Sequence, residues 1–267
     1  MTILRLLSSL IRQFRVWDRP SQAALILALL LLVAVVLAAV LGPADVRQPA
    51  LIGGAGLLLA TQLIILWGNR GLVTPFTQAQ RHFINGDFGA ASDLLETLRA
   101  EGKADARSLT LLGNTYRQLG RLDESETVLY EALNIRREHF PLYGFGRTLL
   151  AQGRYAEAAQ AMEQALALGA PPVAAYDIGE AYFRQHNDDA AREWLTRAKP
   201  LAQEGYRVLM IDYILNQLDG GPLPPRDILQ SGLPYWRASA ERFGHTRYGQ
   251  ALVEDIQHLE TLIEELD

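Results

Sequence analysis

A chain of 267 residues with 25 Lys and Arg side chains against 30 Asp and Glu side chains is mildly acidic, with a formal net charge of −5 at pH 7. It has no basic tract suited to nucleic acid, which argues against a nucleic-acid-binding protein. The chain has no cysteine, which excludes disulfides and is compatible with a cytoplasmic location without being diagnostic of it.

Residues 1–22 form a basic leader. Within Ile3–Trp17, apolar residues at helical spacing share one face, and arginines are available for lipid headgroups. The pattern predicts either a short interfacial helix or a disordered basic leader. The apolar residues are Leu4, Leu7, Leu10, Ile11 and Phe14, and the arginines are Arg5, Arg12 and Arg15.

The sequence of residues 23–67 predicts a transmembrane hairpin. Ala23–Leu41 and Ala50–Trp67 are apolar runs close to the roughly 20 residues that cross a bilayer. The segment between them, Gly42–Pro49, is too short to fold alone and breaks the helix at both ends. A cleaved signal peptide is the competing interpretation of the first run, but its apolar stretch is long and a second span follows. A buried soluble helix pair is the third, although neither run has the polar face such helices usually show.

Arginine counts orient this hairpin. Four arginines precede the first span and one follows the second, against one in the turn: Arg5, Arg12, Arg15 and Arg19, then Arg70, then Arg47. The positive-inside rule therefore places both ends in the cytoplasm. We expect an integral protein of a bacterial inner membrane, with everything after the hairpin cytoplasmic.

Small residues in the second span, Gly53, Gly56 and Ala60, allow another helix to approach closely. The neighbour is either the first span or a helix of another protein. Glycine and alanine are also common in membrane helices for no such reason.

Residues 72–200 repeat four times at a spacing of 33 or 34 residues. Three independent series of small or apolar residues keep the same successive gaps of 34, 33 and 33, which is typical of a stacked repeat array. The series are Ala79, Gly113, Gly146 and Gly179; Ala91, Ser125, Ala158 and Ala191; and Leu98, Ala132, Ala165 and Ala198. In each unit a turn separates two helical stripes, so each unit predicts a helical hairpin that must stack on its neighbours.

The two middle units carry the clearest motif. One reads Leu112, Gly113, Tyr116, Gly120, Leu122, Leu129, Ala132 and Leu133, and the next reads Phe145, Gly146, Gly153, Tyr155, Ala158, Ala165 and Leu166. This pattern resembles the tetratricopeptide repeat family over about half of the chain. The end units depart from it, with Ala79 and His82 in the first and His186 at the turn of the fourth. The resemblance implies an α-solenoid whose concave groove is lined by the first helices, but no single function.

Groove residues follow from the same resemblance. They are Phe76, Gln80, Arg107, Thr110, Asn114, Arg117, Tyr143, Arg147, Tyr176, Glu180 and Arg184. Asn114 and Arg147 occupy matching positions in adjacent units, which suits the capture of an acidic side chain or a peptide carboxylate. The alternatives are ordinary solvated charges, and aromatic residues that pack on the next unit. The chain has only two lysines, Lys103 and Lys199, so the lysine-containing carboxylate clamp of some family members is not reproduced.

Residues 201–267 predict a helical cap and C-terminal helices. Leu201–Leu218 lies where the first helix of a fifth unit belongs, and Gly220–Pro225 ends it. A short helix is expected near Arg226–Gln230 and a final one over Tyr248–Glu265, folding back on the cap or pairing with another chain. Acidic residues are expected on the outside of that final helix: Glu254, Asp255, Glu260, Glu264 and Glu265.

The five histidines are scattered, and no nucleotide loop or hydrolase motif occurs, so we expect no metal, no cofactor and no enzyme. The fold class is all-α: a two-helix transmembrane hairpin, a repeat solenoid and a helical cap. The preferred function is a membrane-anchored noncatalytic adaptor or scaffold that binds a protein or peptide in its groove. The alternative is an accessory or assembly subunit of a membrane complex, contacted through the transmembrane hairpin.

Overall fold

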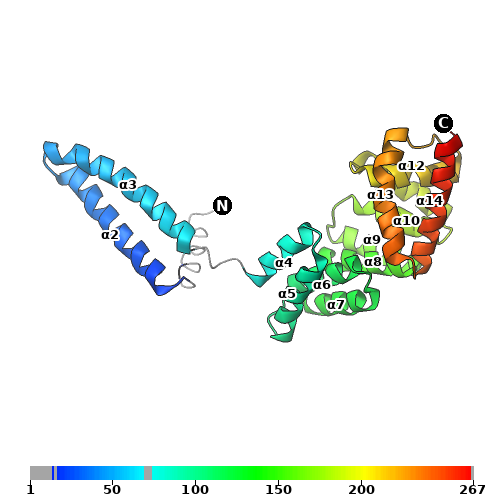
Figure 1. Ribbon diagram of the computed structural model, residues 1–267, viewed down its shortest axis with the longest axis horizontal. Helices are drawn as coiled ribbons and strands as arrows, with labels where there is room; N and C mark the ends of the chain where they lie inside the picture. Colours follow the sequence, from blue (N-terminus) through cyan, green and yellow to red (C-terminus); the bar gives the residue numbers. More distant parts are fainter. Residues whose placement is uncertain (1–13, 15–16, 69–73, 266–267) are drawn as a thin grey trace. The chain divides into compact units, whose positions relative to one another are not determined.

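The protein is helical throughout the ranges in which its structure is described. The computed structural model describes residues 14, 17–68 and 74–265, and no strand occurs in those ranges (Figure 1). The chain divides into two compact units, Met1–Thr74 and Pro75–Asp267. The predicted all-α fold class is confirmed.

In the first unit, α2 (Arg19–Leu41) and α3 (Ala44–Gly68) pack along each other as a hairpin. Both are long and apolar enough to cross a membrane. Their leucines and valines are mostly exposed; the buried residues are Ser21 and Ala28 in α2, and Thr61 and Gly68 in α3. Most of the apolar surface of the pair is therefore not covered by other described residues.

The turn of this hairpin is shorter than predicted. α2 ends at Leu41 and is capped by Gly42, whose N–H donates to the Ala38 carbonyl at 3.0 Å, and α3 begins at Ala44 rather than after Pro49. Proline disrupts a helix by removing one N–H donor and crowding the preceding turn. At Pro49, in the second turn of α3, that loss falls near the helix end, and the helix continues through it.

The small residues of α3 divide between two directions. A Cβ at Gly54 would lie 3.2 Å from Val35 Cγ1, so Gly54 makes the close approach to α2. Gly53 and Gly56 have nothing within 4 Å of such an atom, and with Ala60 they are exposed.

Only Phe14 and Trp17 of the predicted leader helix fall within the described residues. The Trp17 indole is buried against Gly68, where a Cβ would come within 2.5 Å of the ring. The other leader residues, including Arg5, Arg12 and Arg15, lie outside the described ranges, as does Arg70 beyond α3.

The second unit contains four helical hairpins followed by three further helices (Figure 1). The hairpins are α4 (Pro75–Ile84) with α5 (Phe88–Ala100), α6 (Ala106–Gln118) with α7 (Leu122–Ile135), α8 (His139–Gln152) with α9 (Tyr155–Ala167), and α10 (Ala174–Arg184) with α11 (Asp188–Ala198). After a 3-10 turn at Lys199–Leu201 come α12 (Gly205–Asp219), α13 (Arg226–Phe243) and α14 (Arg247–Glu265).

The turn inside each hairpin uses the left-handed backbone region. Gly86, Gly120 and Gly153 have φ values of 78°, 74° and 82°, and His186 has 61° at the equivalent place in the fourth hairpin. Only glycine adopts this conformation without a steric cost, so His186 is the strained exception.

The recurrent small residues lie where the two helices of a hairpin meet. A Cβ would come within 2.4 Å of Leu129 Cγ at Gly113, 2.4 Å of Met162 Cγ at Gly146, and 2.7 Å of Leu195 Cγ at Gly179. The second series, Ala91, Ser125, Ala158 and Ala191, is fully buried. The predicted requirement for close contact at these positions is confirmed.

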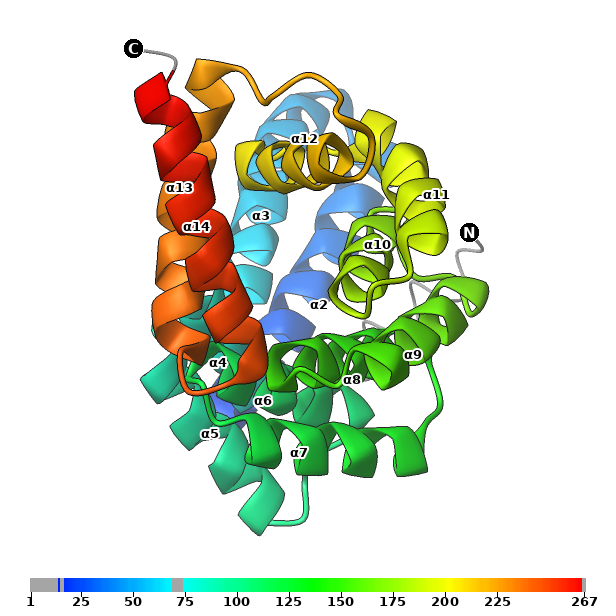
Figure 2. The same ribbon diagram turned by 90° about the vertical axis from the view of Figure 1, so that its right-hand side faces the viewer.

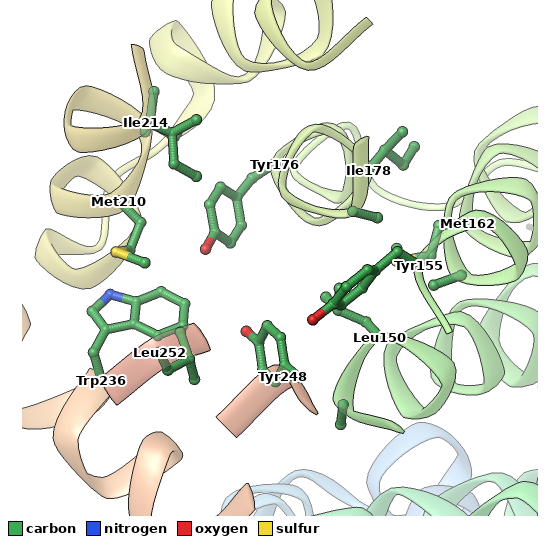
Figure 3. Packing of buried hydrophobic residues seen from close by; sticks show 14 of the residues in the cluster. Leu150, Tyr155, Met162, Tyr176, Ile178, Met210, Ile214, Trp236, Tyr248 and Leu252 are labelled. Atoms are coloured by element: carbon green, nitrogen blue, oxygen red, sulfur yellow. The ribbon is translucent and has the colours of Figure 1, made fainter. Parts of the chain in front are cut away.

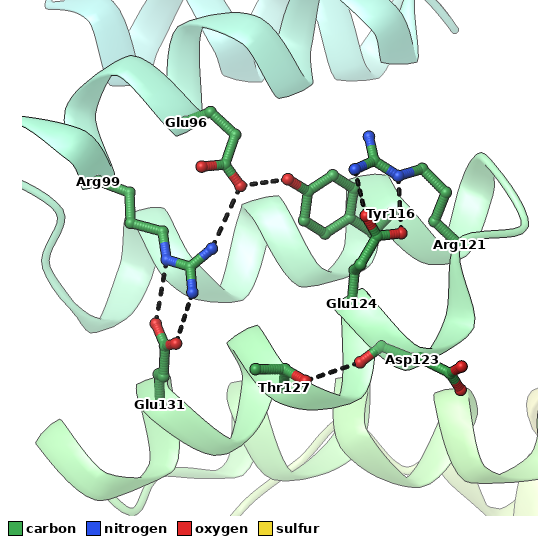
Figure 4. A network of polar contacts seen from close by, with 8 residues as sticks. All are labelled: Glu96, Arg99, Tyr116, Arg121, Asp123, Glu124, Thr127 and Glu131. Atoms are coloured by element: carbon green, nitrogen blue, oxygen red, sulfur yellow. Dashed lines mark hydrogen bonds and ion pairs between the residues drawn. The ribbon is translucent and has the colours of Figure 1, made fainter.

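Charged contacts on the surface connect the first two hairpins (Figure 4). The Arg99 guanidinium of α5 donates to both carboxylate oxygens of Glu131 on α7, at 3.1 and 2.5 Å. It also pairs with Glu96, which accepts a hydrogen bond from the Tyr116 hydroxyl of α6. These side chains are partly exposed, so the contacts lie in solvent-screened surroundings.

The C-terminal helices differ from the prediction in length. α12 packs on α10 and α11 as the first helix of a fifth unit, as expected. α13 runs over 18 residues through Pro234, rather than ending near Gln230, and forms an antiparallel hairpin with α14 (Figure 2). The Trp236 indole of α13 donates to the Tyr206 carbonyl of α12 at 2.7 Å, which joins this hairpin to the cap.

Candidate interaction groove

The concave side of the array is a continuous surface of first helices, since α4, α6, α8, α10 and α12 contact one another in succession. All the predicted groove residues lie on α4, α6, α8 or α10. The parts of the groove differ in whether other helices of the chain cover them.

The hairpin of α13 and α14 covers the C-terminal part of the groove (Figure 2). Arg184 of α10 forms an ion pair with Asp255 of α14, and both side chains are buried. The Tyr248 hydroxyl of α14 donates to Glu180 of α10 at 2.9 Å. The predicted groove residues Tyr176, Glu180 and Arg184 are therefore not free to meet a partner while the hairpin is in place, and Asp255 is buried rather than on the outside of its helix.

Glu180 is the centre of this buried contact. It accepts hydrogen bonds from the hydroxyls of Tyr176 at 2.7 Å and Tyr248 at 2.9 Å, and lies 3.5 Å from the Arg184 guanidinium. Burial raises the pKa of its carboxyl, and the charge of Arg184 and the two hydroxyls oppose that shift. Such a carboxylate stays inside a protein only when its oxygens are paired, so the network depends on Tyr248 from the hairpin.

Aromatic and aliphatic side chains pack around the network (Figure 3). Tyr155, Tyr176 and Tyr248 come from three different helices and turn their hydroxyls toward the space between them. Trp236 lies with its ring centroid 6.3 Å from that of Tyr176, and Leu252 of α14 is fully buried beside them. The hairpin and the last two repeats thus share one hydrophobic core.

In the middle of the groove, the predicted pair of Asn114 and Arg147 has intramolecular partners. Arg147 Nε lies 3.3 Å from Asp177 of α10, which also accepts a hydrogen bond from the Tyr143 hydroxyl. Burial and the Asp177 charge raise the pKa of Tyr143. The Asn114 side-chain oxygen accepts from Arg117 at 3.2 Å. An acidic client would have to compete with Asp177 for Arg147.

The N-terminal part of the groove is open. A cavity of about 200 Å³ is lined there by Phe76 of α4, by Arg107, Thr110 and Asn114 of α6, and by Phe140 at the start of α8. The Arg107 guanidinium lies 5.3 Å from the centroid of the Phe76 ring. Four of the predicted groove residues therefore line one cavity, although Thr110 among them is buried. Gln80 is exposed on α4 and does not line this cavity.

Sequence reasoning missed two kinds of groove residue. Phe140 was not included, although it is the second residue of a first helix, as Phe76 is. Asp177, Tyr248 and Asp255 were not paired with groove residues, because their roles depend on partners far away in the sequence.

No group of three or more His, Cys, Asp or Glu side chains placed to hold a metal ion occurs in the part of the chain that the structure describes. The polar clusters of the groove are instead pairs of basic and acidic side chains with tyrosine hydroxyls.

Two models of the tetratricopeptide repeat family match the repeat region, one at residues 106–141 and one at residues 143–205. The chain thus contains tetratricopeptide repeats within residues 106–205. Such repeats indicate a scaffold for protein interactions. A search of curated proteins finds none that matches the chain.

Solved structures with similar folds are distant in sequence. The MamA RS-1 ArsTM double mutant is 21% identical over 71% of this chain and 95% of that one, with a TM-score of 0.47. MamA 41-end from Desulfovibrio magneticus RS-1 is 19% identical over 72% and 94%, with a TM-score of 0.42. A putative kinesin light chain from Podosopora anserina with nearly identical TPR-like repeats is 18% identical over 72% and 96%, with a TM-score of 0.42.

Proposed function

We propose that this protein is a membrane-anchored, noncatalytic adaptor that binds a segment of a client protein in the open N-terminal part of its groove. The proposal is supported by a difference between two parts of the groove: one is covered by other helices of the chain and the other is not. The groove beside α10 is filled by the chain's own hairpin, whereas the cavity around Phe76, Arg107 and Phe140 is accessible.

The chemistry of the open cavity favours a peptide with one apolar anchor. Its volume of about 200 Å³ is below the roughly 300–1,000 Å³ of typical small-molecule sites, and suits a single large side chain. Phe76 and Phe140 supply apolar contacts, Arg107 is an exposed cation in the lining, and the Glu138 carboxylate, which also lines the cavity, is paired with Arg136 at 2.8 Å. A carboxylate next to the anchor would meet Arg107, which offers paired donors.

The membrane part of the proposal rests on the first unit. α2 and α3 expose apolar side chains along their length, as helices that face lipid do, and both have the length required for a bilayer. The arginine distribution then directs both ends, and with them the repeats, to the cytoplasm. Protease protection in sealed inner-membrane vesicles tests this orientation. If protease added to the cytoplasmic face of the vesicles does not cleave the repeat region, the orientation is rejected.

Photocrosslinking from the open cavity tests the client site. The full-length protein would carry a photoreactive residue at position 140 or 107, and partners would be purified from membranes and identified. Phe140→Ala combined with Arg107→Ala is expected to lose the client while the protein remains folded, because both side chains are exposed.

Tyr130 on α7 provides a matched control, since it is 58% exposed, compared with 60% for Phe140, and does not line the cavity. Tyr130→Ala is expected to keep the client. Equal recovery of every partner by both variants would reject the cavity as the client site.

A second function is favoured by the outward face of α3. Gly53, Gly56 and Ala60 are exposed together, and small residues permit close contact between membrane helices. In an assembly subunit, crosslinks from this face would capture an integral membrane protein, and the groove variants would leave that contact unchanged. Crosslinks confined to lipid would exclude this second function.

A further inference from the structure

An enclosed cavity lies between the groove and the C-terminal hairpin. Its lining includes Arg117 of α6, Arg147 of α8, Arg207 of α12 and Arg242 of α13. Its volume is about 30 Å³, compared with the roughly 10–15 Å³ that one water molecule needs. Tyr235 also lines it and is 37% exposed.

Positive charge exceeds negative charge in this cavity. Against the four guanidinium groups stand two carboxylates, Asp177 and Glu180. Asp177 is engaged by Arg147 and the Tyr143 hydroxyl. Glu180 is engaged by two tyrosine hydroxyls and by Arg184 from outside the cavity.

Two of the four arginines have no carboxylate partner among the described residues. Arg207 pairs with Glu204 at 2.7 Å, but Arg117 donates only to the Asn114 side chain and Arg242 only to the Gln118 side chain, the latter at 2.6 Å. Glutamine and asparagine oxygens accept hydrogen bonds without neutralising the charge.

Of these two arginines, Arg117 is the more deeply buried. Its residue is 6% exposed, and its Nε has no hydrogen-bond partner in the described part of the chain. Burial, and next the charge of Arg147, lower the pKa of the guanidinium to about 9, so it still carries its proton at neutral pH. Buried charges in proteins are normally paired with an opposite charge, and this one is not paired by any described side chain.

We propose that the cavity binds a small doubly charged oxyanion of the phosphate or sulfate class. Guanidinium groups from the array and from the hairpin, above all Arg117 and Arg242, would donate to its oxygens. The small volume excludes a nucleotide or a peptide chain. Because the donors come from both sides of the interface, the bound anion strengthens the attachment of the α13–α14 hairpin to the groove.

The test is a phosphate titration of the full-length protein in detergent at constant ionic strength and neutral pH, with potassium chloride as the balancing salt. Saturable binding is expected by calorimetry. The melting temperature should rise by about 5–10 °C at a phosphate concentration 100-fold above Kd. Hydrogen exchange in α13 and α14 should slow in parallel.

Arg117→Met is expected to abolish the phosphate response and to raise the melting temperature without phosphate, because it removes an unpaired buried charge. Arg197→Met is the control: Arg197 is exposed on α11 and does not line the cavity, so its variant should respond as the wild type does. If Arg117→Met fails to fold, Arg242→Met serves in its place, because Arg242 is only half-buried. It should weaken phosphate binding about tenfold or more.

Three results would overturn the proposal. Absence of a saturable phosphate response in the wild type would show that the cavity is not an anion site. An equal response to chloride alone would reject the doubly charged class. Unchanged phosphate affinity in both arginine variants would place any binding elsewhere on the protein.

Discussion

The first two repeats and the last two are built on the same columns of small residues and each has a hydrophobic core, yet their grooves are covered differently. A partly exposed ion pair between Arg99 and Glu131 connects α5 to α7, and the Tyr116 hydroxyl of α6 donates to Glu96 of α5. The groove beside these helices is open. The groove beside α10 is closed by a helical hairpin that contributes aromatic rings and a buried ion pair. One repeat architecture thus provides an accessible surface at one end and a sealed one at the other.

The buried ion pair should show the largest effect. Arg184→Met leaves Asp255 buried and uncompensated, and should lower the free energy of unfolding by about 3–5 kcal/mol. Urea denaturation of the full-length protein measures this. Arg184→Met with Asp255→Leu removes both charges and should recover part of the loss, because the buried Glu180 still lacks the Arg184 charge. A loss below about 1 kcal/mol in the single variant would contradict the sealed character of this end.

The close contact inside the third repeat should come next. At Gly146 an added Cβ would meet Met162 Cγ at 2.4 Å and the Ala158 carbonyl oxygen at 3.2 Å, so Gly146→Ala forces the helices apart. We expect the free energy of unfolding, measured by thermal unfolding, to fall by about 1–3 kcal/mol. Gly89→Ala in α5 is the matched control, since nothing lies within 4 Å of its added Cβ. That variant should gain up to about 1 kcal/mol from helix propensity.

A helix cap in the open half gives a smaller effect that depends on pH. The Asp105 carboxylate accepts hydrogen bonds from the Ser108 amide and hydroxyl at 2.8 and 2.7 Å. Burial opposes the charge, but these bonds outweigh it and lower the pKa of Asp105 below its usual 3.8. The stabilisation is therefore fully present above about pH 4 and is lost as the pH falls through the lowered pKa.

Asp105→Ala should cost about 1 kcal/mol near neutral pH, and its difference from the wild type should shrink in acid. Asp105→Asn keeps an uncharged cap oxygen, so its contribution should not change over that range. Denaturant titrations at several pH values provide the measurement, and a constant difference for Asp105→Ala would contradict the charge effect.

The exposed pair between Arg99 and Glu131 should show the smallest effect. Their side chains are 33% and 40% exposed, so a double-mutant cycle should give about 0.2–1 kcal/mol, decreasing as salt is added. The Arg184–Asp255 pair should respond much less to salt because it is buried. Equal salt dependence of the two pairs would remove the distinction between the two ends of the array.

Local and periodic features were predictable from the sequence. The small residues at Gly113, Gly146 and Gly179 mark close helix contacts, and the turn positions at Gly120 and Gly153 have the left-handed backbone expected of glycine there. Both depend on neighbours within one repeat, so the period of the sequence displays them directly. The order of the helices follows for the same reason.

The covering of the groove was not predictable in this way. Arg184 meets Asp255 across 71 positions, and Glu180 meets Tyr248 across 68. No sequence period relates these residues. In the sequence alone, Asp255 cannot be distinguished from a carboxylate that faces solvent, because its arginine partner is not known. Long-range pairing thus decides which predicted groove residues remain accessible.

The short connection between α12 and α13 has a consequence for binding at the sealed end. Gly220–Pro225 joins the cap to the hairpin and includes three prolines, so a displaced hairpin stays tethered close to its site. Its effective concentration there is on the order of millimolar for so short a tether. A free competitor must therefore bind much more tightly than the hairpin does, whereas cleavage of this connection would remove that advantage in a single step.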